Sequence, residues 1–111
     1  MSAMSMRNGT TPQTEESIGV RIVQKAIELI ERPNGWCKGA WWKTIKGSFW
    51  KGDREYAYSI DGALLESSPD FRSLGEAYRV LKKTSGWVND FNDRPETTQQ
   101  QAIAFLRERI V

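Results

Sequence analysis

The residues with the clearest chemical potential lie together in one stretch, GWCKGAWWKTIKGSFWKGDREY, residues 35–56. This stretch holds four of the five tryptophans and four of the seven lysines of the 111-residue chain. Nucleic-acid bases stack on aromatic rings while ammonium groups meet phosphates, and tryptophan is also strongly enriched at protein-binding hot spots. The candidate binding residues are Trp36, Lys38, Trp41, Trp42, Lys43, Lys46, Trp50 and Lys51.

Packing competes with recognition for these rings. Burying a tryptophan stabilises a fold by roughly 3 kcal/mol or more, so the core takes its share of the indoles first. In a strand, Trp41 and Lys43 would face one side and Trp42 the other, so that only some of the rings reach solvent. We expect Trp36 to cover one end of the core. Three interpretations stay open for the other rings: packing, a surface for a protein partner, and a surface for nucleic acid or another anion.

The stretch is locally basic although the whole chain is nearly balanced. The chain carries 16 basic and 14 acidic residues, a net charge of +2. Residues 36–55 alone hold five basic and two acidic residues, a sum of +3, which leaves −1 for the remainder. This mild asymmetry points to the stretch, rather than to the whole surface, as the contact for an anionic partner.

The residue types exclude several chemistries. The chain has no histidine, which rules out a histidine-based zinc site, a Ser-His-Asp triad and a Cys-His pair. Its single cysteine, Cys37, forms no internal disulfide and has no base to activate it, so we expect an ordinary buried thiol. The segment GWCKGAWWK lacks the spacing of a phosphate-binding loop. We predict no catalytic residue, no cofactor and no resident metal.

Carboxylates and amides supply the remaining candidates, Asp61 and the run NDFNDRP, residues 89–95. Oxygen ligands in this run could hold a divalent ion, but Asn and Asp also fold back on their own backbone, and we expect such turns here. We interpret Asp61 as a surface carboxylate or a backbone cap. Asp61, Asn92 and Asp93 form a candidate polar pocket. An enzyme that uses only carboxylates is the least favoured function.

Hydrophobic periodicity predicts a mainly α fold (α+β), with about four amphipathic helices in one bundle. The first helix runs over about 15–31 and ends at Pro33-Asn34-Gly35. The second spans about 55–67, and its central Gly62 suits the close approach of another helix or an aromatic ring. The inward face of the first helix consists of Ile22, Val23, Ala26, Ile27 and Ile30.

Capping signals bound the other two helices. Ser68-Pro69-Asp70 reads as an N-cap with proline at the first helical position, and Ser73 with Glu76 offers a second capping box. This third helix ends at Ser85-Gly86. The fourth helix begins at Thr98, where Gln101 completes a capping box and Ala102, Ile103, Leu106 and Ile110 face inward.

The stretch between the first two helices favours strands. The simplest prediction is a β-hairpin in which Ala40–Ile45 pairs with Ser48–Lys51 across a Lys46-Gly47 turn. A long structured loop is the alternative, because an isolated hairpin is marginal unless it packs on something.

Residues 1–14 are polar and predict a flexible tail, which leaves 15–111 as a single compact domain. No apolar run is long enough for a secretion signal or a membrane span, so we expect a cytoplasmic protein without membrane contact.

Three segments share their order and spacing with a known pattern: VQKAIELIERPNGWCKG (23–39), YSIDGALLES (58–67) and FNDRPETTQQQAIAFLRERI (91–110). They resemble a family of small bacterial and phage domains of unknown function. In that family a first helix ends in a Gly-Trp-x-x-Gly turn, a helix with Gly-Ala-Leu follows, and an aromatic-Asn-Asp turn precedes a last helix opened by Thr. The chain departs from the pattern at Tyr58-Ser59, where the family has an aromatic-Cys pair. The resemblance implies a compact helical fold and no known activity.

These observations favour a small non-enzymatic binding or regulatory module that contacts a protein partner through its Trp/Lys-rich stretch. Nucleic-acid or nucleotide binding through the same stretch is the alternative. Binding of nucleic acid would weaken steeply with salt, whereas binding of a protein through indole rings would not. Exposed indoles would favour either form of recognition over packing.

Overall fold

The computed structural model describes residues 15–45 and 56–110. The predicted tail lies outside these ranges, and so do the predicted Lys46-Gly47 turn and return strand Ser48–Lys51, which include Trp50. Within them the chain forms five helices and two short strands. In chain order these are α1 (Glu15–Ile30), β2 (Trp42–Thr44), β3 (Tyr56–Tyr58), α2 (Ile60–Glu66), α3 (Phe71–Leu81), α4 (Ser85–Asp93) and α5 (Gln99–Arg109).

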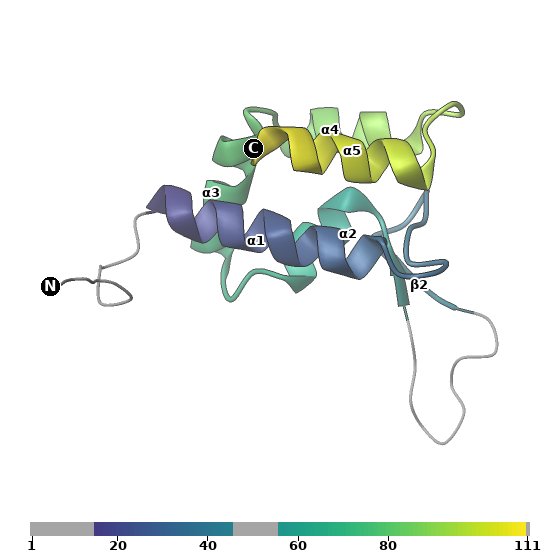
Figure 1. The fold of residues 1–111 in the computed structure, drawn as a ribbon, viewed down its shortest axis with the longest axis horizontal. Coiled ribbons are helices and arrows are strands. Elements are labelled where there is room, and N and C mark those ends of the chain that lie inside the picture. The colour runs from purple at the N-terminus through teal and green to yellow at the C-terminus, as the bar shows by residue number, and fades with distance from the viewer. Residues whose placement is uncertain (1–14, 46–55, 111) are drawn as a thin grey trace, which may run out of the picture.

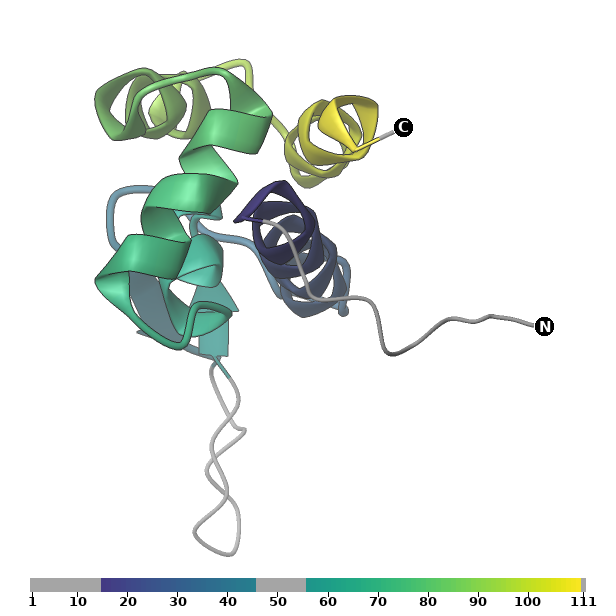
Figure 2. The same cartoon turned by 90° about the vertical axis from the view of Figure 1, so that its left-hand side faces the viewer.

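Helix α1 is the central element, and it packs against α2, α3 and α5. Figures 1 and 2 show α4 and α5 in one layer above α1, while α2 and the strands lie below that layer. Helix α3 runs steeply beside α1 and leads up to α4 (Figure 2). The described residues therefore form a mainly helical bundle with a small antiparallel sheet at one end, and the prediction of about four helices is one short.

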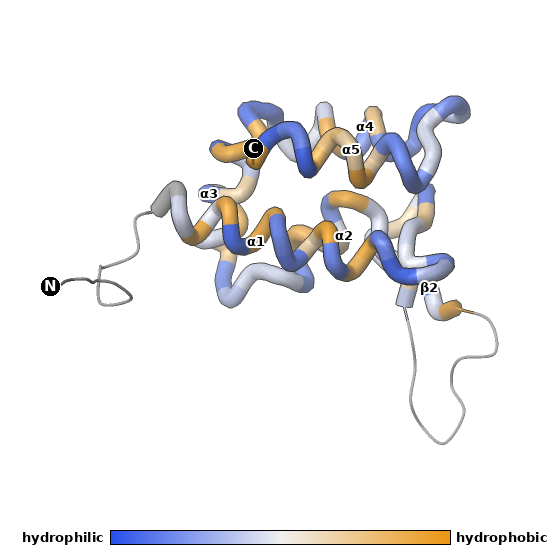
Figure 3. Tube along the Cα trace, in the orientation of Figure 1, coloured by the Kyte–Doolittle hydropathy of each residue, from blue (hydrophilic) through white to orange (hydrophobic). Residues whose placement is uncertain are grey.

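The inward face of α1 is as predicted. Ile22, Val23, Ala26, Ile27 and Ile30 are all buried in one core, and the helix ends at Ile30, within one residue of the predicted end. Figure 3 shows apolar and polar positions alternating along α1 at helical spacing. Periodicity of this length determines a buried face without help from distant residues.

A β-hairpin lies between the first two helices as predicted, but its return strand is not the predicted one. Strand β2 pairs antiparallel with β3, in the register Trp42↔Tyr58, Lys43↔Ala57 and Thr44↔Tyr56. The predicted partner of this strand was Ser48–Lys51, and β3 was assigned to the start of the second helix. Ala57 and Tyr58 are buried, so tertiary packing selects an extended conformation where local helical spacing suggested a helix.

Helix α2 is consequently shorter than predicted and begins only at Ile60. Ser59 is its N-cap, with a side-chain oxygen that accepts a hydrogen bond from the Gly62 amide at 3.0 Å. Gly62 does meet a close neighbour, although this is main chain rather than a helix or a ring. A Cβ at position 62 would lie 1.8 Å from the carbonyl oxygen of Trp41. The absence of a side chain at Gly62 lets the loop that leads into β2 lie directly on α2.

The predicted third helix is two helices. Asp70 is the N-cap of α3, accepting from the Ser73 amide at 2.7 Å, so neither Ser68 nor the Ser73–Glu76 box caps the helix. Helix α3 ends at Leu81, followed by Lys82 in the left-handed conformation with φ 58°. Thr84 then caps α4, and Ser85-Gly86, predicted as a helix end, lies in its first turn. Of the run 89–95, for which turns were predicted, residues 89–93 are therefore helix and only Arg94 and Pro95 lie in a bend and a turn.

Helix α5 confirms its predicted cap. The Thr98 side chain accepts from the Gln101 amide at 3.2 Å, and the Gln101 side chain accepts from the Thr98 amide at 3.0 Å. Ala102 and Leu106 are buried as expected, while Ile103 and Ile110 are partly buried. Among the helices of the described ranges, none has the length and apolar character needed to cross a bilayer.

Replacement of Gly62 by alanine tests the contact between α2 and the loop before β2. The new Cβ would overlap a main-chain carbonyl, which cannot move aside as a flexible side chain can. We expect Gly62→Ala to lose about 1–3 kcal/mol of stability, despite the helix preference of alanine. Gly75→Ala is the matched control, because no atom lies within 4 Å of its added Cβ, and it should gain up to about 1 kcal/mol. Urea denaturation followed by circular dichroism measures both, and equal stability of the two variants would contradict the contact.

Candidate functional site

The Trp/Lys-rich stretch is divided between two environments. Trp41 and Trp42 are 49% and 55% exposed, and Lys43 beside them is also exposed. Trp36 and Lys38 are instead half-buried at the junction between the sheet and α4. Trp36 thus packs against the core as expected, whereas packing alone does not account for the exposed pair Trp41 and Trp42.

The hydrogen bonds of β3 show which edge of the sheet is open. The Tyr58 amide donates to the Gly35 carbonyl at 2.8 Å, and its carbonyl accepts from the Cys37 amide at 3.1 Å. The Tyr56 carbonyl accepts from the Arg32 guanidinium at 2.9 Å. Both tyrosines therefore direct their main-chain groups away from β2. Strand β3 is paired on both of its sides.

Because hydrogen-bonded and non-hydrogen-bonded pairs alternate along an antiparallel ladder, the direction of each main-chain group of β2 follows from those of β3. Because Tyr56 and Tyr58 bond elsewhere, Lys43 and Ala57 are the residues that exchange hydrogen bonds across the antiparallel pair. The N–H and C=O groups of Trp42 and Thr44 point outward, where no partner is found within residues 15–45 and 56–110. We call this the β2 edge, made of Trp42, Lys43 and Thr44, all three exposed.

The strand is held firmly despite its exposure. The Trp41 carbonyl accepts from the Ser59 amide at 3.1 Å and lies against Gly62. The Trp42 ring meets the Tyr56 ring edge-on, with centroids 5.1 Å apart and planes at 80°, a favourable aromatic geometry. The backbone that carries the two exposed indoles is therefore fixed by contacts with α2 and β3.

The buried Asn92 side chain joins the sheet to α4. Its oxygen accepts from the Trp36 indole N–H at 2.7 Å and from the Ile60 amide at 3.0 Å. Its nitrogen donates to the Cys37 carbonyl at 3.1 Å and to the Asp93 carboxylate at 2.9 Å. Both donors and both acceptor sites of the amide are therefore used.

A second set of bonds fixes the loop before β2. The Gly39 amide donates to the Asp93 carboxylate at 3.0 Å. The Lys38 ammonium donates to the carbonyls of Arg94 and Pro95 at 2.5 and 3.2 Å, at the C-terminal end of α4 where positive charge is favourable. Lys38 and Asp93, both predicted as functional residues, hold the loop that presents Trp41.

Asp61 is neither a surface carboxylate nor a backbone cap. Its side chain is 3% exposed and accepts a hydrogen bond from the Tyr78 hydroxyl. Burial raises the pKa of the Asp61 carboxyl, the Tyr78 bond partly opposes this shift, and the nearby Asp93 charge adds to it. The three residues of the predicted polar pocket are therefore neighbours, but Asp61 bonds to Tyr78 whereas Asn92 and Asp93 bond to each other and to the sheet.

Cys37 is the buried thiol expected from the sequence. Its Sγ lies 3.6 Å from the Ala57 carbonyl oxygen, and burial raises the pKa of the thiol. Within the described ranges no group of three or more carboxylate or thiol residues is arranged to hold a metal ion.

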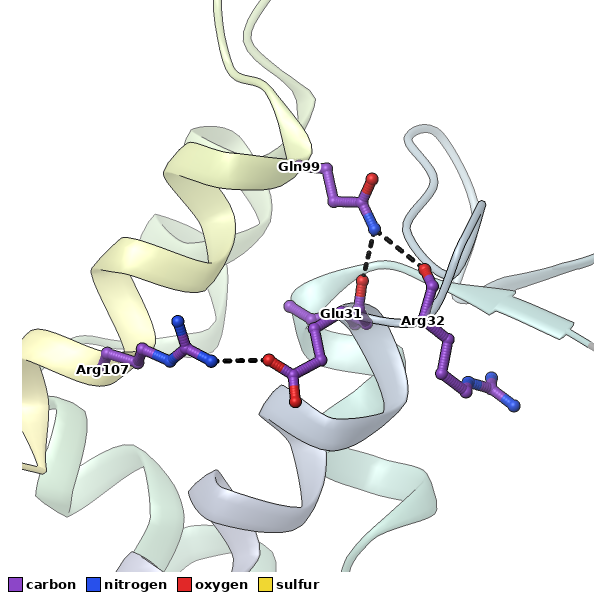
Figure 4. Close-up of polar contacts among 5 residues, drawn as sticks. Glu31, Arg32, Gln99 and Arg107 are labelled. Atoms are coloured by element: carbon purple, nitrogen blue, oxygen red, sulfur yellow. Dashed lines mark hydrogen bonds and ion pairs between the residues drawn. The ribbon is translucent and has the colours of Figure 1, made fainter.

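Sequence reasoning missed a set of hydrogen bonds and an ion pair that connect β3, through the end of α1, to α5. Gln99 of α5 donates to the carbonyls of Ile30 and Arg32 at 2.6 and 3.1 Å, and Arg107 pairs with Glu31 at 2.5 Å (Figure 4). Arg32 in turn donates to β3. These residues come from opposite ends of the chain, and no local pattern links them.

A cluster of aromatic rings on α4 and α5 was also missed. Trp87 and Phe91 stack at 5.5 Å, and both lie near the Phe105 ring. Their spacing of four residues is the signal that could have indicated a helix in 85–93. Trp87 is partly buried in this cluster, so it serves packing rather than the exposed site.

The comparisons with known proteins identify the family of the chain. The profile of a family of unknown function (DUF6197) matches residues 19–110, and the chain belongs to that family. This agrees with the resemblance seen in the sequence. Curated proteins gave no match, and neither did solved structures.

Replacement of Asn92 tests the junction that it forms. Asn92→Leu keeps the volume but leaves the Trp36 N–H, the Ile60 N–H and the Cys37 carbonyl without their partner. We expect a loss of at least about 3 kcal/mol in the free energy of unfolding, measured with urea. Asn89→Leu on the exposed side of α4 is the control and should change stability little. A small effect of Asn92→Leu would contradict the junction.

The pKa of Asp61 predicts a pH dependence of stability. Since the folded state raises this pKa above its unfolded value of about 4, the carboxyl stabilises the fold most below that pH, and stability is lost as pH rises through the folded pKa. Asp61→Asn cannot ionise and can still accept from Tyr78. We expect it to match the wild type in acid and to exceed it at neutral pH, by about 1.4 kcal/mol for each unit of the shift.

Asp70→Asn supplies a control of opposite sign. The backbone amide of Ser73 lowers the pKa of Asp70, so this carboxylate stabilises the fold above its unfolded pKa and loses that effect in acid. Urea titrations over a range of pH distinguish the two variants. Parallel stability curves for the wild type and Asp61→Asn would contradict the assignment for Asp61.

Proposed function

We propose that the protein is a non-enzymatic binding module that recognises a protein partner through Trp41, Trp42 and Lys43. The observation that carries the proposal is the exposure of two adjacent indoles, 49% and 55%, on a backbone fixed against α2. The exposed faces of such rings contribute little to the stability of the free domain, whereas a partner that covers them gains buried apolar area. A position fixed in advance also reduces the entropy lost on binding.

Within the part of the chain that the structure describes, the geometry favours a protein over a nucleic acid as the partner. Nucleic-acid affinity comes largely from several cations that neutralise phosphates. Of the two described lysines of the stretch, Lys38 is occupied by backbone carbonyls and Lys43 alone is exposed. The Trp42 ring also packs against Tyr56, and this contact limits the use of Trp42 as a platform on which bases could stack. Leu65, 39% exposed and one turn beyond Gly62, adds apolar area on α2.

Selection of ligands from two random libraries tests this function. One library displays linear peptides and the other contains single-stranded and duplex oligonucleotides. We expect peptides to be enriched, and Trp42→Ala to weaken the selected peptides by at least about tenfold, which corresponds to a loss of about 1.4 kcal/mol or more. Salt should change this affinity little.

Two further variants make the test decisive. Phe71→Ala removes an aromatic ring that is 82% exposed but lies at the start of α3, and it should leave peptide affinity unchanged. Lys43→Ala should matter less than Trp42→Ala. Enrichment of oligonucleotides, with affinity that falls steeply with salt and with Lys43→Ala, would instead support nucleic-acid binding.

A further inference from the structure

We propose that the partner binds as an extended segment that adds a third strand to the β2 edge and places a carboxylate opposite Lys43. This inference rests on the proposed function and specifies its mode and the chemistry of its ligand. Strand addition uses the main chain for affinity and alternate side chains for specificity.

The backbone of the sheet permits growth in one direction. Strand β3 is occupied on its far side by Gly35, Cys37 and Arg32, as its three hydrogen bonds show. On the side of β2 that faces away from β3, the N–H and C=O groups of Trp42 and Thr44 point outward without partners in the described chain. Four main-chain groups in a row at hydrogen-bonding spacing form a template for another strand.

The register of an added strand follows from the same alternation. Opposite Trp42 and Thr44 the new strand would exchange hydrogen bonds, whereas opposite Lys43 it would form a close pair without hydrogen bonds, with Cα atoms about 4.5 Å apart. Side chains of such pairs approach most closely. Whatever faces Lys43 therefore contacts it directly.

Charge indicates what that residue is. Lys43 is exposed and forms no ion pair within the described part of the chain. An opposite charge directly across an antiparallel pair is stabilising, and a like charge is destabilising. An Asp or Glu at this position of the ligand is the complement of Lys43.

The same lysine argues against a second copy of the chain. An antiparallel pairing of two β2 edges that uses all three residues of each strand places Lys43 opposite its own copy. Lysine in the middle of an edge strand is a recognised device against such self-association. The occupant is accordingly a different, acidic segment.

The two faces of the added strand would meet different side chains of β2. Trp42 and Thr44 project on one face of the sheet, and Lys43 on the other. Side chains of the new strand would lie next to Trp42 on the first face and next to Lys43 on the second. Alternating apolar and acidic positions in the ligand match these two faces.

The main-chain mode is tested by proline at an outward-facing position. Thr44→Pro removes an N–H that points away from β3 and fixes φ at about −65°, a change that an edge strand tolerates at such a position. Thr44→Val retains that N–H and is the matched control. The probes are the peptides selected from the random linear library on the wild-type chain.

We expect Thr44→Pro to weaken the selected peptides by about tenfold or more, while Thr44→Val binds as the wild type does. Methylation of the backbone nitrogens of a selected peptide should cause a similar loss. Replacing the acidic residue of a selected peptide by lysine should weaken its binding to the wild type but not its binding to Lys43→Ala. Melting curves confirm that the two Thr44 variants are folded.

Hydrogen exchange supplies a readout in the folded wild-type chain. The Lys43 amide, bonded within the sheet, should exchange more slowly than the Trp42 and Thr44 amides in the free protein. Addition of a selected peptide should then slow exchange at Trp42 and Thr44. Unchanged exchange there would overturn strand addition.

The outcomes separate the binding mode from the proposed function. Loss of binding in Trp42→Ala together with full binding in Thr44→Pro would overturn strand addition and leave the function in place. Full binding in both variants would overturn both. Concentration-dependent dimers of the wild type that Thr44→Pro abolishes would identify a second copy as the occupant and overturn the acidic segment.

Discussion

The carboxamide of Asn92 is the interaction on which the exposed strand depends. It is buried at the centre of a junction where α4, the start of α2 and the segment after α1 meet, and each of its four hydrogen-bonding positions is occupied. A buried amide with all partners in place allows one arrangement of its neighbours, because any other leaves polar groups unsatisfied. The sheet is thereby fixed relative to the helices, and the exposed rings are fixed relative to the sheet.

The two sides of the short sheet have different surroundings. Toward the interior, β3 buries Ala57 and Tyr58 and satisfies its backbone through Gly35, Cys37 and Arg32. Toward the outside, β2 leaves main chain and indoles open. The half-buried Lys38 contributes to the inner side by donating to the end of α4. Composition alone could not separate the inner residues from the exposed ones, because both sides of the sheet contain Trp and Lys.

Sequence reasoning succeeded where the determining contacts are local. The apolar face of α1 and the Thr98–Gln101 box follow from spacings of three and four residues. It failed where distant contacts override propensity. The Asn/Asp-rich run favours turns locally, yet it is helical in α4, where Asn92 bonds to residues more than thirty positions away and Phe91 packs on α5. The exposure of Trp41 and Trp42 depends on the pairing with β3 and the contact with Gly62, and hydrophobic periodicity in the sequence does not indicate either contact.

The unequal surroundings of the tryptophans have an optical consequence. Among the four tryptophans of the described ranges, Trp36 donates its indole N–H to a buried amide and Trp87 packs against two phenylalanine rings, whereas Trp41 and Trp42 face water. Indole emission shifts to longer wavelength in a polar, mobile environment, so the outer pair contributes at the red side of the spectrum and the inner pair at the blue side. The chain thus carries its own fluorescent reporter of whether the surface formed by β2 is covered, without any added label.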